Sequence, residues 1–101
     1  MGLLDIFLGN KNDKIRTFVS RGALIVDVRS ETEFKHGSIK NATNIPLQKI
    51  IGEAGSLKKL GKPIITCCAS GIRSAKAAKI LKVYGIETIN GGGWKRLEKL
   101  V

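Results

Sequence analysis

Two short runs of apolar residues, each placed before a helix pattern, constrain this chain more than any other feature. Residues 23–28 are Ala-Leu-Ile-Val-Asp-Val and residues 64–67 are Ile-Ile-Thr-Cys. A continuous apolar run suits a strand buried on both faces, as in a parallel sheet that helices cover. Residues 39–45, closed by Pro46, and residues 86–89 are expected to be extended as well. The sequence therefore predicts an α/β fold with a central parallel sheet flanked by helices.

Helix patterns separate these extended segments. Residues 74–84 give the clearest one, because apolar residues recur at i, i+3, i+4 and i+7 while lysines take the outer face. Asn12 or Asp13 is expected to cap an earlier helix. Ser30 is expected to begin a short one, because Glu33 follows three residues later and completes a capping-box pattern.

The length of the chain fits one domain. It has 101 residues, of which 43% are hydrophobic, and single domains cluster near about 100–150 residues. We expect one domain over residues 1–101, with residues 1–12 as an N-terminal extension in which the spacing over residues 3–8 favours a short helix. The chain shows neither the apolar stretch of a membrane span nor the basic start of a signal peptide, so we expect a cytoplasmic protein without a membrane partner.

The charge balance is strongly basic. Lysine and arginine total 18 against 8 for aspartate and glutamate, which gives a formal net charge of +10. Such an excess attracts anions, whether nucleic acids, acidic proteins or small anionic substrates. The cations are spread in runs no longer than two, and no zinc-finger, RNP or helix-turn-helix pattern accompanies them. A nucleic-acid partner is therefore not expected.

The two cysteines of the chain, Cys67 and Cys68, are adjacent. Adjacent cysteines do not form a disulfide framework, and neighbouring Cα atoms about 3.8 Å apart are too close for ordinary disulfide geometry. A structural zinc site needs four ligands, and His36 is the single histidine, so no metal is expected. The pair indicates free thiols in a reducing compartment, with Cys67 packed in the core.

The second cysteine opens a loop that leads from a buried strand into the clearest helix pattern. In parallel sheets the reactive site lies at the carboxyl ends of the strands. A cysteine at that place lies near the N-terminus of a helix, whose dipole favours the thiolate. Gly71 allows the loop to curl so that several backbone N–H groups point at one spot, and Arg73 adds a positive charge. The loop predicts Cys68 as a nucleophile within an anion-binding loop made of Ala69, Ser70, Gly71, Ile72, Arg73 and Ser74.

The loop Cys68-Ala-Ser-Gly-Ile-Arg-Ser74 resembles the active-site loop of the rhodanese-like sulfurtransferases, whose pattern is Cys-x-x-Gly-x-Arg-Ser. Further segments resemble that family in the same order along roughly residues 13–101: Ile25-Val-Asp-Val-Arg29, Glu33-Phe34, Asn44-Ile-Pro-Leu47 and the closing glycine-rich turn Gly91-Gly-Gly-Trp94. Two positions depart from the pattern. Gly37-Ser38-Ile39 stands where the family usually has Gly-His-Ile, and Ala69 stands where relatives often have arginine, which is expected to weaken anion binding.

The resemblance implies a three-layer rhodanese-like fold and sulfur transfer. The Cys68 thiolate would attack the outer sulfur of thiosulfate or of a persulfide donor, become a persulfide, and pass the sulfur to cyanide, a thiol or a partner protein. The amides of residues 69–73 would hold the negative charge of the persulfide. No cofactor is implied.

Other polar and aromatic residues near the expected site are assigned supporting roles. Asp27 and Arg29, at the end of the first strand, are interpreted as a pair that steadies the loops behind the site. His36 is interpreted as a surface residue and Trp94 as core packing.

Two alternatives remain open at this level. Counted from Cys67, five residues precede Arg73 and Ser74 follows, which is the loop of cysteine-based phosphatases and arsenate reductases, so Cys67 or Cys68 could serve such an enzyme. Rhodanese-like domains also occur as non-catalytic binding modules. The uptake of sulfur by the thiol distinguishes these possibilities.

Overall fold

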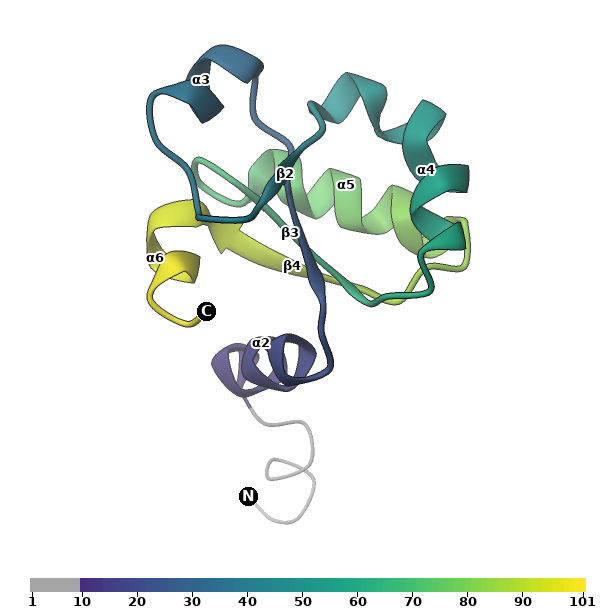
Figure 1. The fold of residues 1–101 in the computed structure, drawn as a ribbon, viewed down its shortest axis with the longest axis horizontal. Helices are drawn as coiled ribbons and strands as arrows, with labels where there is room; N and C mark the ends of the chain where they lie inside the picture. The colour runs from purple at the N-terminus through teal and green to yellow at the C-terminus, as the bar shows by residue number, and fades with distance from the viewer. Residues whose placement is uncertain (1–9) are drawn as a thin grey trace.

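Four parallel strands form the centre of the molecule (Figure 1). The computed structural model describes residues 10–101, so the helix expected over residues 3–8 lies outside the described part. The strand order across the sheet is β2-β1-β3-β4. The bounds are β1 (Leu24–Asp27), β2 (Thr43–Asn44), β3 (Ile64–Cys68) and β4 (Thr88–Gly93). All five residues of β3 are buried, which confirms the prediction of a central parallel sheet.

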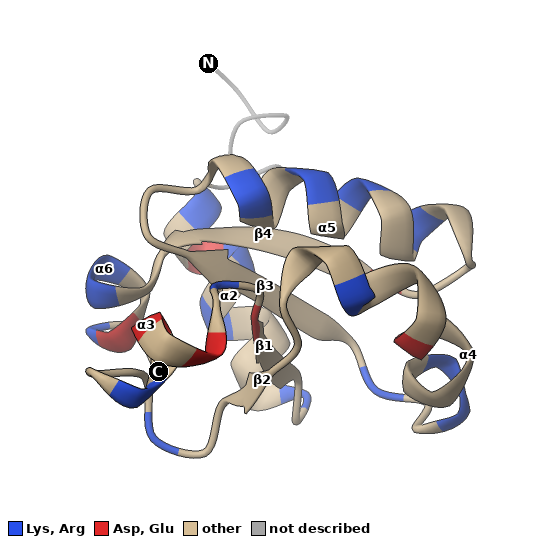
Figure 2. Ribbon diagram, turned by 90° about the horizontal axis from the view of Figure 1, so that it is seen from above, with Lys and Arg blue, Asp and Glu red and all other residues tan. Residues whose placement is uncertain are grey.

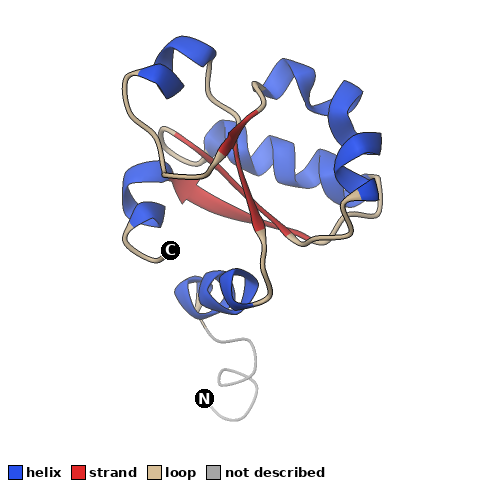
Figure 3. Ribbon diagram, in the orientation of Figure 1, coloured by secondary structure: helices blue, strands red, loops and turns tan. Residues whose placement is uncertain are grey.

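Helices cover both faces of this sheet, as Figure 3 shows. α4 (Ile50–Lys59) and α5 (Ile72–Val83) pack on one face, where Val26 and Cys68 join the apolar cluster. α2 (Lys11–Ser20) and α6 (Trp94–Glu98) pack on the other, where Cys67 joins a second cluster. The short helices α3 (Glu31–Lys35) and η1 (Leu47–Lys49) follow the carboxyl ends of β1 and β2. This arrangement is the predicted three-layer fold.

The helix starts follow local hydrogen bonding. The capping box at α3 is confirmed, because Ser30 Oγ accepts from the N–H of Glu33 and the Glu33 carboxylate accepts from the N–H of Ser30. The cap of α2 is Asn10, whose Oδ1 accepts from the Asp13 N–H at 2.8 Å, so the expectation of Asn12 or Asp13 was wrong. The helix expected from residue 74 begins two residues earlier, after Gly71.

Two extended segments differ from their predictions. Only Thr43–Asn44 of the expected segment 39–45 pairs as a strand, and Asn41, with φ 69°, turns the chain just before it. The last strand covers Thr88–Gly93 instead of residues 86–89, so glycines 91–93 belong to a strand and not to a turn. Glycine is required in this strand because its backbone lies close to β3. A Cβ on Gly91 would lie 2.7 Å from the Thr66 carbonyl oxygen, so a larger residue does not fit there.

This close approach makes Gly91 sensitive to the smallest side chain. In Gly91→Ala the new methyl group would lie 2.7 Å from Ile65 Cγ2 and 2.9 Å from Leu97 Cδ2. We expect the free energy of unfolding in urea to fall by about 1–3 kcal/mol, as overpacked cores do. Gly52→Ala in α4 is the matched control, because nothing lies within 4 Å of its Cβ position. Equal stability of the two variants would contradict the strand packing described here.

Candidate active site

Cys68 lies at the point where β3 ends and the loop to α5 begins. Its side chain is almost fully buried, with 1% of the residue exposed. The loop turns back through Gly71, whose φ of 105° places it in the left-handed region that favours glycine. As a result the Gly71 N–H donates to Cys68 Sγ at 3.0 Å and the Ser74 N–H donates at 3.4 Å. The Ser74 hydroxyl lies 3.3 Å from the same sulfur.

These contacts decide the protonation of Cys68. Burial by itself raises the pKa of the thiol, because it penalises the charged form. The Ser74 hydroxyl and the backbone N–H groups of Ser74, Gly71 and Ser70 act in the opposite direction and outweigh burial. The pKa of Cys68 is therefore lowered from its ordinary value, as a nucleophilic thiol requires.

Cys67 has the opposite environment, although it is the adjacent residue. Successive side chains of a strand point to opposite faces, and Cys67 packs with Ile15 and Leu97 beneath α2 and α6. It is fully buried, and that burial, together with the carboxylate of Asp27, raises its pKa to about 12. The prediction that Cys67 lies in the core is confirmed.

The positive charge of Arg73 is paired with a carboxylate, which the sequence analysis did not predict. Its Nη1 and Nη2 donate to the two carboxylate oxygens of Glu33, at 2.8 and 3.0 Å. Hydrogen bonds from Arg73 and from the Ser30 N–H lower the pKa of Glu33 to about 2. Arg73 thus joins the loop to α3, and the described contacts to Cys68 Sγ come from backbone N–H groups and the Ser74 hydroxyl.

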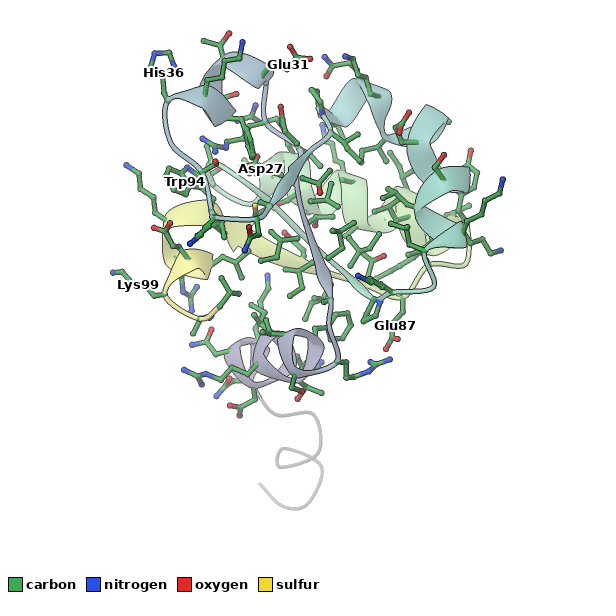
Figure 4. The ribbon with its side chains drawn as sticks, viewed as in Figure 1. Asp27, Glu31, His36, Glu87, Trp94 and Lys99 are labelled. Carbon is green, nitrogen blue, oxygen red and sulfur yellow. The ribbon has the colours of Figure 1, made fainter. Side chains whose placement is uncertain are left out.

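Asp27 and Arg29 form a buried pair behind the loop. Arg29 Nη2 donates to Asp27 Oδ2 at 2.7 Å and to the Gly37 carbonyl at 2.7 Å. The guanidinium carbon also lies 4.7 Å from the centroid of the Trp94 ring. The pair therefore joins the end of β1, the turn after α3 and the start of α6, which supports the interpretation that it steadies loops. In Figure 4, Asp27 lies inside the molecule, whereas the exposed His36 projects from the end of α3.

Asn90 is a residue of the site that the sequence analysis missed. Its Oδ1 accepts from the Ser74 hydroxyl at 2.7 Å and from the Gly92 N–H at 2.9 Å, and its Nδ2 donates to the Gly71 carbonyl at 3.2 Å. Asn90 thereby joins β4 to Gly71 and Ser74, the two residues whose N–H groups donate to Cys68 Sγ. The sequence did contain a signal, which is an amide side chain near the end of the strand beside β3. It was missed because the strand was expected to end at residue 89, one residue before Asn90.

Comparison with known proteins agrees with this geometry. The family model of the rhodanese-like domain matches residues 11–99. The chain belongs to the rhodanese-like domain family. The four-stranded parallel sheet and the loop after its third strand are therefore the rhodanese-like fold, as the sequence motifs indicated.

Individual relatives support the family at moderate identity. A rhodanese-like domain protein from Staphylococcus aureus has a crystal structure that is 32% identical, covers 86% of each chain and gives a TM-score of 0.71. A putative mitochondrial thiosulfate sulfurtransferase of Schizosaccharomyces pombe is 32% identical over 73% of this chain and 62% of its own length. A rhodanese with anions from E. coli is 27% identical, covers 72% of this chain and 88% of its own, with a TM-score of 0.66. The chain spans between 13% and 66% of the length of the curated relatives compared.

A cleft of about 560 Å³ lies beside the loop that follows Cys68. Its walls come from the loop, the glycines of β4, the start of α2 and α6: Lys11, Asn12, Ile15, Ala69, Ser70, Gly71, Ile72, Asn90, Gly91, Gly92, Gly93, Arg96 and Leu100. Cys68 is not among these residues, so the cleft borders the loop without including the sulfur. Within residues 10–101, no group of three or more His, Cys, Asp or Glu side chains could hold a metal ion, and no helix is long and apolar enough to cross a membrane.

The two cysteines are expected to differ in their reaction with iodoacetamide. Cys68 should be modified first in the folded protein, at a rate that rises with pH to a midpoint below the ordinary thiol value of 9.0. Cys67, with a pKa of about 12 and no exposure, should react only after unfolding in urea. Peptide mass mapping over time measures both rates. Equal labelling of the two residues in the folded protein would contradict the assignment of Cys68.

Asn90 offers a second test of the same sulfur. Asn90→Asp keeps an acceptor for Ser74 and Gly92 but places a negative charge one hydroxyl group away from Cys68 Sγ. We expect the pKa of Cys68, measured from thiolate absorbance against pH, to rise, because a nearby negative charge disfavours the thiolate. Asn41→Asp, the same change at an exposed position, should leave this pKa unaltered. An unchanged pKa in Asn90→Asp would show that Asn90 does not influence the thiol.

Proposed function

We propose that this rhodanese-like protein is a sulfurtransferase that carries a sulfane sulfur on Cys68. The observation that carries the proposal is the environment of Cys68 Sγ: a buried sulfur with a lowered pKa that accepts hydrogen bonds from the N–H groups of Gly71 and Ser74. Relatives named as sulfurtransferases at 31–33% identity support the same chemistry.

The first half-reaction loads the enzyme. The Cys68 thiolate attacks the outer sulfur of thiosulfate, the sulfur–sulfur bond of thiosulfate breaks, and sulfite leaves with the bonding electron pair. A persulfide donor reacts in the same way and leaves as a thiolate. The persulfide on Cys68 keeps one negative charge on its outer sulfur. The backbone N–H groups of residues 69–73, which the curled loop directs inward, stabilise this charge as an oxyanion hole stabilises a negatively charged oxygen.

The second half-reaction unloads it. Cyanide, a thiolate or the thiolate of a partner protein attacks the outer sulfur, the Cys68 Sγ–sulfur bond breaks, and the Cys68 thiolate returns. The cycle is ping-pong and needs no cofactor, because at each step the nucleophile supplies the electron pair of the new bond and the leaving group departs with the pair of the old one. Because Ala69 adds no cation, binding of the donor relies on the loop amides. We place the activity in a reducing compartment such as the cytoplasm, where free thiols persist.

The geometry does not favour the phosphatase alternative. A loop counted from Cys67 would need the Cys67 sulfur at its centre, yet that side chain points to the opposite face of the sheet from Cys68. The loop that curls around a sulfur has four residues between Cys68 and Arg73, which leaves a smaller cradle than the phosphatase pattern. A binding module without catalysis remains an outcome of the test below.

Substitution of each cysteine in turn tests the proposal. We expect Cys68→Ser to lower thiocyanate formation from thiosulfate and cyanide by at least about a thousandfold, since the nucleophile is lost. Cys67→Ser should keep most of the activity, because Cys67 makes no contact with the loop sulfur. After thiosulfate treatment, the intact mass of the wild type and of Cys67→Ser should show one added sulfur atom that dithiothreitol removes. The intact mass of Cys68→Ser should show none.

Three results would overturn the proposal. Equal loss of activity in both folded variants would rule out a single nucleophile. Hydrolysis of an aryl phosphate without sulfur uptake would favour the phosphatase. A folded wild-type protein that neither takes up sulfur nor hydrolyses phosphate would be a binding module.

A further inference from the structure

The outer face of α5 carries an exposed stripe that the chemistry of Cys68 does not use. Ile72, Lys76, Lys79 and Val83 lie at i, i+4, i+7 and i+11 and share this face, which we name the α5 stripe. Ile72 is 68% exposed and Val83 is 81% exposed, so two large aliphatic side chains project into solvent at its two ends. The stripe begins inside the candidate active-site loop.

The middle of the stripe is positively charged, and within residues 10–101 no carboxylate pairs with its lysines. α5 contains no aspartate or glutamate. Within residues 10–101, Lys76, Lys79 and the adjacent Lys82 form no ion pair. Acidic groups are paired elsewhere, as in Glu31–Lys49, Glu33–Arg73 and Glu87–Arg21. Figure 2 shows the result, with blue segments following one another along α5 and no red among them.

The position of Cys68 limits which acceptors can reach it. The residue is 1% exposed, and its sulfur lies behind a loop whose Gly71 N–H donates to it. A thiol on a flat protein surface cannot approach such a sulfur, whereas a thiol on a projecting, extended segment can. The segment that carries the thiol must lie beside the loop, and α5 is the element that leads away from the loop there.

We propose that the α5 stripe docks the protein that exchanges sulfur with Cys68, and that this partner carries its reactive thiol on an extended acidic segment. Carboxylates of the segment pair with Lys76 and Lys79, and its apolar side chains cover Ile72 and Val83. From Ile72 to Val83 the helix rises by about 16 Å, which about five residues of extended chain span. The proposal rests on the proposed function, since it names the partner class of the same site.

Matched peptide acceptors test the stripe. Each peptide carries one cysteine at its end, followed by five residues, of which two are leucines and the other three are either glutamates or glutamines. The second-order rate of sulfur transfer from the persulfide-loaded protein is measured at low salt. We expect the glutamate peptide to react at least about tenfold faster than the glutamine peptide, and added salt to reduce the difference, as for steered association.

Charge reversal locates the effect. Lys76→Glu with Lys79→Glu should slow the glutamate peptide at least about fivefold. Loading at saturating thiosulfate should stay unchanged, because saturation removes the effect of charge on association. Lys58→Glu with Lys59→Glu, at the exposed end of α4, changes the net charge equally and should have a much smaller effect. Val83→Ser should weaken both peptides without altering the salt dependence. Equal slowing by the two double variants would mean that net charge alone attracts the peptide and would overturn the proposal.

Binding without transfer separates this proposal from the proposed function. Fluorescent peptides with serine in place of cysteine report docking by anisotropy whether or not Cys68 accepts sulfur. If loading fails while the glutamate peptide still binds through Lys76 and Lys79, the sulfurtransferase proposal fails and the docking surface stands. If the glutamate and glutamine peptides bind equally, or if an RNA hairpin binds the stripe more tightly than the glutamate peptide, the acidic partner is wrong.

Discussion

A thiolate can be buried only where N–H and O–H donors replace the water that it loses, and the described site is organised around that requirement. Desolvation acts on both cysteines and, taken alone, raises the pKa of a thiol. Cys68 overcomes it because the backbone bends so that Gly71 and Ser74 donate to its sulfur. Within residues 10–101 no N–H or O–H group donates to the Cys67 sulfur, which stays a thiol in the core. One step along β3 thus separates the nucleophile that we propose from a packing residue.

The curvature of the loop depends in turn on glycines that come from two different segments. Gly71 takes a φ of 105°, and a Cβ there would lie 3.3 Å from Gly92 Cα. A Cβ on Gly93 would lie 2.9 Å from the Ala69 carbonyl oxygen. The loop can therefore lie directly on the backbone of β4, which brings Asn90 within reach of the Ser74 hydroxyl. The glycines at the end of β4 thus allow the Asn90 amide to lie beside the loop that follows Cys68.

Much of this could be predicted from the sequence, and the failures have physical causes. The runs at residues 23–28 and 64–67 gave the parallel sheet, because burial on both faces leaves a pattern in the sequence itself. Glycines 91–93 were interpreted as a turn, since the crowding by Ile65 and Thr66 that requires glycine in a strand is a tertiary contact. The pairing of Arg73 with Glu33 joins residues 40 positions apart, so no local pattern in the sequence predicts it. Glu33 was identified only as part of a capping box, and Arg73 only as a cation of the loop.

Glu33 belongs to two parts of the molecule at once. Its carboxylate completes the capping box of α3 and also holds both terminal nitrogens of Arg73. The start of a helix and the loop around Cys68 are therefore energetically coupled, and local opening of one weakens the other. Because the pKa of Glu33 falls from 4.5 to about 2, this coupling is fully present above pH 4.5 and is lost as the pH falls toward 2. Fraying of α3 at neutral pH would release the Arg73 guanidinium, so a five-residue helix at the edge of the sheet controls how much positive charge the loop presents.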